Sequence, residues 1–258
     1  MFFKTKDQVS LYYDDVGEGQ PLVFLTGFSG NTEIWFRQRE YFKKNFRVIT
    51  LDYRNHGRSD RVDYGIRINK LATDVVELLG FMKVKQPIIV GNSMGGSVAL
   101  NIAKNEGWQF FKKMVIVDQS PKMIHENGWN YGFKDLRRDN FFNVISVPLK
   151  HANFSRLDDE VYKRSKAVDI EHPFSNGANG DLMTDHSLKD WRQVLKDSDK
   201  PVLFILGEQS PFYDINDSNQ LEQFGNNVEI KHIDQAGHLP MAEQPDRFNE
   251  ILLQFIKE

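Results

Sequence analysis

Cysteine is absent from this chain of 258 residues. That absence excludes disulfide bonds, zinc sites built from thiolates, and a cysteine nucleophile. Seven histidines remain as possible metal ligands, but the sequence contains no HExxH motif or comparable cluster. We therefore expect no metal site.

Long apolar runs and clusters of one charge are also lacking. No window approaches 18 uninterrupted apolar residues, so the sequence predicts no membrane-spanning helix. The first residues, MFFKTKDQVSLYYDD, turn charged within a few positions and lack the apolar core of a signal peptide. The formal net charge is -3 and there is no basic stripe, which argues against nucleic-acid and membrane partners. Together these absences favour a cytoplasmic protein.

Short apolar runs alternate with amphipathic segments along most of the chain. Continuous apolar runs of this length are typical of strands buried on both faces, as in a parallel sheet. The predicted strands cover residues 9–13, 21–26, 46–51, 87–90, 114–117, 201–206 and 228–233. The predicted helices cover residues 32–44, 68–82, a segment after Ser93, and 245–257. The alternation predicts right-handed βαβ crossovers and helices on both faces of one sheet.

Residues 119–195 interrupt this alternation, because they are rich in aromatic residues and contain no clear strand. We predict a mostly helical insertion into a core formed by residues 1–118 and 196–258. The insertion begins at the expected carboxyl end of a strand, where α/β sheets bind ligands, which favours a cap over a site rather than extra packing. Four histidines of the insertion could face a pocket, although surface or packing roles are more common: His125, His151, His172 and His186.

The stretch IIVGNSMGGSVAL, residues 88–100, places a serine between glycines where a buried strand ends and a helix begins. Strand, Gly-x-Ser-x-Gly and helix is the context of a nucleophile elbow, in which small residues allow a sharp turn that exposes the serine. The motif alone is weak, since a glycine-rich turn or a phosphate-binding turn could also produce it. A Walker loop is excluded, because no Gly-Lys-Ser/Thr follows. We predict that Ser93 is a nucleophile and that the Met94 N–H stabilises an oxyanion.

A nucleophilic serine needs a general base, and His238 is the best candidate. It lies in IDQAGHLPMAEQP, just after the last predicted strand and before the final helix. In hydrolases with a nucleophile elbow the histidine comes last along the chain. A lone loop histidine is more often a surface residue, but order and position favour catalysis here. His232 falls inside an alternating strand and is better explained as structural.

With these motifs the chain resembles the α/β-hydrolase superfamily, in particular its small capped serine esterase-like members. The resemblance covers nearly the whole chain outside the insertion and includes VFLTGFSGN, LDYRNHGRS and the final helix QPDRFNEILLQFI. It implies a mostly parallel eight-stranded sheet with helices on both faces and a helical cap inserted after the sixth strand. It also implies that the Phe28 N–H is the second oxyanion donor, although Thr26 replaces the usual histidine. The turn from Asp52 to Ser59 would be structural.

A carboxylate usually completes a catalytic triad with the serine and the histidine. Its position in this sequence departs from the family's common pattern. The family's acid usually follows the seventh strand, but here that position is Ser210 in PVLFILGEQSPFYD. Asp214 lies four residues further on and would require the loop to bend back. Asp118 directly follows the sixth strand, where some members of the superfamily carry their acid. It could instead be a turn or helix-capping residue, but the lack of an acid at position 210 favours the catalytic role. We favour Asp118 as the acid and keep Asp214 as the alternative.

These residues predict a serine hydrolase that cleaves small to medium carboxylic esters through an acyl-enzyme, without a cofactor. The same triad could instead support a proline iminopeptidase, a thioesterase, a carbon–carbon hydrolase or a perhydrolase. An exopeptidase would need acidic residues for the substrate amine, and LDDE supplies Asp158, Asp159 and Glu160. A second alternative is a hydrolase-fold sensor of a small molecule with very slow turnover. No pattern in the sequence specifies an oligomeric state.

Overall fold

The described strands form one sheet in the order β1-β2-β4-β3-β5-β6-β7-β8. The structure is a computed structural model that describes residues 1–147 and 151–258. The strands are β1 (Phe2–Lys4), β2 (Ser10–Val16), β3 (Pro21–Leu25), β4 (Arg47–Leu51), β5 (Ile88–Asn92), β6 (Lys113–Val117), β7 (Val202–Gly207) and β8 (Val228–Ile233). The β1–β2 and β2–β4 pairs are antiparallel, and every later pair in the sheet is parallel. The predicted mostly parallel sheet of eight strands is confirmed.

Helices connect these strands as the sequence predicts, with small differences at the ends. The longer helices are α2 (Ile68–Phe81), α3 (Met94–Glu106), α5 (Asp159–Glu171), α6 (Gly180–Ser187) and α9 (Pro245–Lys257). The shorter ones are α1 (Phe36–Phe42), α4 (Phe141–Ile145), α7 (Arg192–Lys196), α8 (Pro240–Glu243) and the 3-10 helices η1 (Thr32–Trp35), η2 (Trp108–Phe110) and η3 (Ile215–Phe224). The helix predicted over 32–44 is split into η1 and α1.

The strands bury alternate side chains in two separate apolar cores, one on each face of the sheet. Val23 and Leu25 of β3 belong to the core that includes apolar residues of α2 and α3. Their neighbours Leu22 and Phe24 belong to the other core, with residues of α1 and α9. Because every strand of the centre is buried on both sides, its side chains form the continuous apolar runs seen in the sequence.

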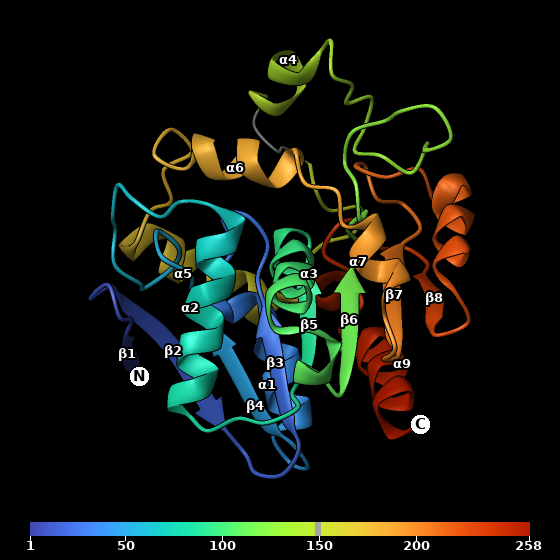
Figure 1. Cartoon of the computed structure of the whole chain (residues 1–258). Helices are drawn as coiled ribbons and strands as arrows, with labels where there is room; N and C mark the ends of the chain where they lie inside the picture. Colours follow the sequence, from blue (N-terminus) through green and yellow to red (C-terminus); the bar gives the residue numbers. More distant parts are fainter. Residues whose placement is uncertain (148–150) are drawn as a thin grey trace.

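The segment between β6 and β7 contains α4, α5, α6 and α7. Figure 1 shows α4 and α6 beyond the arrowheads of β5 and β6, at the carboxyl ends of the parallel strands. Residues 119–140 of this segment fold as turns and two isolated bridges rather than as a helix. This segment therefore lies over the edge of the sheet where the nucleophile elbow is expected.

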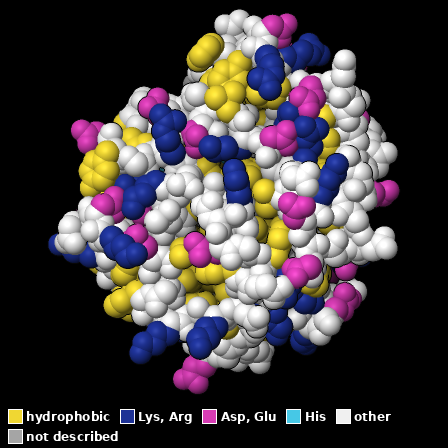
Figure 2. Space-filling model, viewed as in Figure 1, with side chains coloured by type: hydrophobic (Ala, Val, Ile, Leu, Met, Phe, Trp, Pro, Cys, Tyr) yellow, Lys and Arg dark blue, Asp and Glu magenta, His cyan; other side chains and the backbone are white. Residues whose placement is uncertain are grey.

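The surface carries charges of both signs. Figure 2 shows basic and acidic side chains interspersed on the viewed face, and apolar side chains gathered at the top, near α4. Phe142 of α4 is 76% exposed. Among the described residues, no helix is long and apolar enough to cross a bilayer.

Candidate active site

Ser93 lies on a strained turn between β5 and α3. Its backbone has φ 53° and ψ -123°, a conformation that costs a non-glycine residue about 1–3 kcal/mol. A Cβ on Gly91 would lie 2.4 Å from the carbonyl carbon of Gly95, and one on Gly95 would lie 2.5 Å from the Leu25 oxygen. Both positions therefore require glycine for the strand and the helix to approach each other. The Ser93 side chain is consequently held at the carboxyl edge of the sheet.

Two backbone amides lie beside this serine. Met94 is the first residue of α3, where the leading N–H groups of a helix have no partner within the helix. The loop after β3 passes directly against Ser93, since a Cβ on Gly27 would lie 3.1 Å from the Ser93 Cβ. Gly30 N–H donates to the Gly27 oxygen at 3.1 Å, which closes this loop into a tight turn. Within the described residues, neither the Phe28 nor the Met94 amide donates a backbone hydrogen bond.

His238 and Asp118 are in direct contact. His238 Nδ1 lies 2.6 Å from Asp118 Oδ2, a distance typical of a charge-assisted hydrogen bond. The two residues are 7% and 1% exposed, so water competes little for this contact. Ser93 and His238 line the same cavity, although no hydrogen bond of the Ser93 hydroxyl is present among the described residues. Such bonds are often loose before substrate binds.

The hydrogen-bond partners of Asp118 differ from those of Asp214. Gly207 N–H donates to Asp118 Oδ1 at 3.2 Å, and Ser210 Oγ donates to Oδ2 at 2.7 Å. Asp214 is exposed and caps η3, where its side chain accepts from the Asn216 amide at 2.9 Å. Its carboxylate is therefore engaged with its own helix, whereas that of Asp118 faces His238.

Two further side chains hold the loop that carries His238. Asn92, next to the nucleophile, donates from Nδ2 to the His238 oxygen at 3.0 Å. Glu243 is buried, and its carboxylate accepts hydrogen bonds from four backbone amides. These amides belong to Gly237, Leu239, Phe154 and Ser155, at 2.7–3.1 Å. The loop is thus fixed both to β5 and to the segment between β6 and β7.

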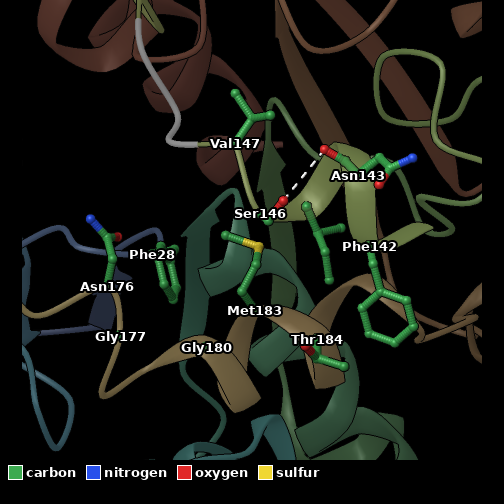
Figure 3. Close-up of a pocket in the computed structure, with 11 residues that line it drawn as sticks. Phe28, Phe142, Asn143, Ser146, Val147, Asn176, Gly177, Gly180, Met183 and Thr184 are labelled. Carbon is green, nitrogen blue, oxygen red and sulfur yellow. Dashed lines mark hydrogen bonds between the residues drawn. The ribbon is translucent and has the colours of Figure 1, made fainter. Parts of the chain in front are cut away.

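Three cavities meet at Phe28. A cavity of about 210 Å³ is lined by Ser93 and His238, and a much smaller one of about 10 Å³ also touches both residues. A third cavity, of about 600 Å³, lies between α4 and α6 and is lined by Met183 and Thr184. Figure 3 shows the side chains of Phe28 and Met183 at this outer cavity. Met183 also lines the smallest cavity, so Phe28 and Met183 separate the outer cavity from the space around Ser93.

The turn from Asp52 to Ser59 ties several loops together behind the site. Asp52 accepts from the Thr32 amide at 2.7 Å and from the Arg58 amide at 2.9 Å. Burial raises the pKa of Asp52 to about 6, although these two amides act in the opposite direction. Arg54 forms a fully buried ion pair with Asp74 at 2.7 Å.

With one exception, the remaining candidate histidines and acidic residues are not among the described residues that line the two cavities at Ser93. His232 is exposed on β8 and lies 3.3 Å from the Ser218 hydroxyl. Asp158 caps α5 and pairs with Arg37 at 2.8 Å. The exception is His186, which lines the smallest cavity together with Ser93 and His238.

Sequence reasoning missed Glu243 and Gln119 and did not distinguish His186 from the other histidines of the insertion. Gln119 follows Asp118 directly and also lines the smallest cavity. Only the position of Gln119, one residue after the candidate acid, could have drawn attention to it. In residues 1–147 and 151–258, no three histidine, aspartate or glutamate side chains are grouped to hold a metal ion.

The chain belongs to the family described as alpha/beta hydrolase fold, whose profile matches residues 20–245. This match covers the elbow, the histidine loop and both candidate acids. The eight-stranded sheet agrees with that family, and so does the strand–serine–helix turn.

Individual relatives are similar over almost the whole chain. An AB hydrolase superfamily protein of Bacillus subtilis, YisY, is 24% identical, and the match covers 98% of each chain. The 3-oxoadipate enol-lactonase 1 of Acinetobacter baylyi is 25% identical over 92% of this chain and 88% of its own. Among solved structures, an esterase from Exiguobacterium antarcticum superposes with a TM-score of 0.87 at 20% identity. That match covers 100% of this chain and 99% of the esterase, and it shows a shared fold.

Proposed function

We propose that this protein is a serine hydrolase that cleaves small to medium carboxylic esters with Ser93, His238 and Asp118. The observation that carries the proposal is the 2.6 Å contact between His238 Nδ1 and Asp118 Oδ2, beside a serine on a strained elbow. The family assignment supports hydrolysis. A relative named above is an enol-lactonase and the structure that shares the fold is an esterase, and both names describe ester chemistry.

The proposed reaction is a two-step acyl transfer. Ser93 Oγ attacks the ester carbonyl while His238 Nε2 accepts its proton, and the resulting imidazolium returns that proton to the leaving alcohol. Asp118 holds the imidazole tautomer with the proton on Nδ1 and stabilises the imidazolium. The Phe28 and Met94 amides bind the oxyanion, and the loss of one such donor typically costs about 3 kcal/mol of the barrier. Water then hydrolyses the acyl-enzyme by the same route in reverse.

Residues 119–195 act in this proposal as a cap that sets substrate size. The cavity of about 210 Å³ at Ser93 is smaller than typical sites for drug-sized ligands, which favours a short acyl or alcohol group. Apolar side chains of Leu157 and Phe212 line it, which suits an aliphatic chain. An exopeptidase role has less support, because Asp158, Asp159 and Glu160 are each paired with an arginine.

The test is hydrolysis of p-nitrophenyl esters from C2 to C12 by the wild type and by Ser93→Ala. We expect a burst of nitrophenol with the wild type, a mass increase of the acyl group on the peptide that contains Ser93, and neither in the variant. Activity that persists in Ser93→Ala would contradict the proposal. Very slow turnover of every ester by the wild type would instead favour the alternative of a hydrolase-fold sensor of a small molecule.

A further inference from the structure

The smallest cavity beside Ser93 contains two buried polar side chains without complete hydrogen bonding. Gln119 is 1% exposed and His186 is 4% exposed. Gln119 Oε1 and His186 Nδ1 are both buried, and neither has a hydrogen-bond partner within residues 1–147 and 151–258. A buried polar atom without a partner costs about 1–3 kcal/mol, so two of them in one cavity require an explanation.

The orientation of Gln119 is determined by its neighbour. Its Nε2 donates to the Ser120 carbonyl oxygen at 2.8 Å. A carbonyl oxygen can only accept, so the amide nitrogen must face Ser120 and the amide oxygen must remain on the other side. Gln119 therefore offers an acceptor in the cavity.

His186 offers a ring that can donate. It belongs to α6 and lines the cavity from the segment between β6 and β7. Burial lowers the pKa of His186 to about 4, so the ring is neutral near pH 7. A neutral imidazole has one N–H donor and one acceptor nitrogen.

The size of the cavity and the side chains that line it limit which chemical group of a ligand could bind there. Its volume is about 10 Å³, close to the minimum that holds a single water-sized group. Its other walls come mainly from the apolar side chains of Met123, Phe133 and Phe212, together with the phenol of Tyr213. Among the described residues, no aspartate, glutamate, lysine or arginine lines it. A carboxylate or an ammonium group would be buried there without a counter-charge, which is costly.

We propose that Gln119 and His186 form a specificity site for a hydroxyl group of the substrate, beside the scissile ester. A hydroxyl donates to Gln119 Oε1 and accepts from the His186 N–H, which matches both free positions with one small neutral group. This inference rests on the proposed esterase function and adds the substrate class, a hydroxy ester. Sites built to bind a hydroxyl discriminate strongly against analogues that lack it, because the polar groups are then left unpaired.

The experiment compares four substrates by acid release at constant pH: ethyl butyrate, both enantiomers of ethyl 3-hydroxybutyrate, and 2-hydroxyethyl butyrate. The second and third carry the hydroxyl on the acyl side, and the fourth carries it on the alcohol side. We expect the wild type to prefer at least one hydroxy ester over ethyl butyrate by about tenfold or more in kcat/KM.

The variants Gln119→Met and His186→Leu should each reduce this ratio to near one. Gln38→Met is the matched control, because Gln38 is a fully buried glutamine of α1 whose Oε1 also has no partner in the part of the chain that the structure describes. Gln38 does not line the cavities at Ser93, so this variant should keep the wild-type ratio.

Two results would overturn the inference while the esterase function stands. One is an equal kcat/KM of the wild type for all four esters. The other is a preference that both cavity variants retain, which would mean that the pair binds only a buried structural water. If the wild type hydrolyses none of the four esters and no p-nitrophenyl ester, the proposed function itself fails.

Discussion

Ser210 and His238 share one oxygen atom of Asp118. The Ser210 hydroxyl donates to Asp118 Oδ2 at 2.7 Å, and His238 Nδ1 lies 2.6 Å from the same atom. Ser210 occupies the position after the seventh strand where the family usually carries its acid. The residue at that position thus contacts the carboxylate that follows the neighbouring strand, β6, instead of supplying one.

Ser210→Ala should lower kcat/KM for p-nitrophenyl butyrate by about tenfold. The variant removes a hydrogen bond to a buried carboxylate, and such bonds contribute about 1.5–3 kcal/mol. Ser218→Ala is the control, because Ser218 is a buried serine that contacts His232, away from the site. Equal rates for the two variants would show that Ser210 does not support Asp118.

Glu243→Gln should lower the free energy of unfolding by about 2–4 kcal/mol. Its carboxylate accepts from four backbone amides, and an amide side chain would turn an NH₂ group toward some of these donors. Urea unfolding measures the effect. Glu250→Gln on the exposed face of α9 should change the stability by less than about 0.5 kcal/mol. A Glu243→Gln protein as stable as this control would contradict the role of Glu243.

Met183→Ala should shift the optimum of the p-nitrophenyl series toward longer chains. Met183 separates the cavity of about 600 Å³ from the space around Ser93, so its removal should admit about two more methylenes. At about 0.8 kcal/mol for each buried methylene, the ratio of kcat/KM for long over short esters should rise about tenfold. Thr184 lines the outer cavity but not the cavities at Ser93, so Thr184→Ala should leave the optimal chain length unchanged. An unchanged optimum in Met183→Ala would contradict this division of the cavities.

Lowering the pH should decrease the free energy of unfolding, in part through protonation of His56. Burial lowers the pKa of His56 to about 4, from an ordinary value of 6.5. Between these values the unfolded chain binds the proton more readily, so the stability from this group is complete above pH 6.5 and is lost as the pH falls toward 4. His186 acts in the same direction, whereas the raised pKa of Asp52 acts in the opposite direction below pH 6.

His56→Phe therefore should make the free energy of unfolding less dependent on pH between 6.5 and 4. The slope should decrease by up to about 1.4 kcal/mol per pH unit, the limit for one proton. Urea unfolding of the wild type and the variant at several pH values measures it. Parallel curves for the two proteins would contradict the assignment to His56.

Local patterns in the sequence predicted most of the fold, because the strands at the centre of the sheet are buried on both faces. The helix predicted over 245–257 has the bounds of α9, and the one over 68–82 ends one residue after α2. β1 was not predicted, since it has three residues and only one of them is even partly buried. The turns of residues 119–140 have no periodic pattern from which they could be read.

Residues of the candidate site were predictable only where both their chemistry and their order along the chain match those of a serine hydrolase. Ser93 and His238 stand out because a strained elbow needs glycines and the base follows last along the chain. Glu243 could not be found this way, since two of its partners lie almost 90 residues away along the chain. The pairing of Gln119 with His186 in one cavity likewise arises from tertiary structure, which brings the loop after β6 and helix α6 to the same cavity.

The most direct test of the account compares Asp118→Asn with Asp214→Asn on p-nitrophenyl butyrate, with melting temperatures measured in parallel. If Asp118 orients His238, Asp118→Asn should lower kcat by up to about 10⁴-fold while the protein stays folded. Asp214→Asn should remain within about twofold of the wild type, because Asp214 caps η3 and is exposed. A folded Asp118→Asn enzyme with normal kcat, or a crippled Asp214→Asn enzyme, would contradict the triad proposed for this protein.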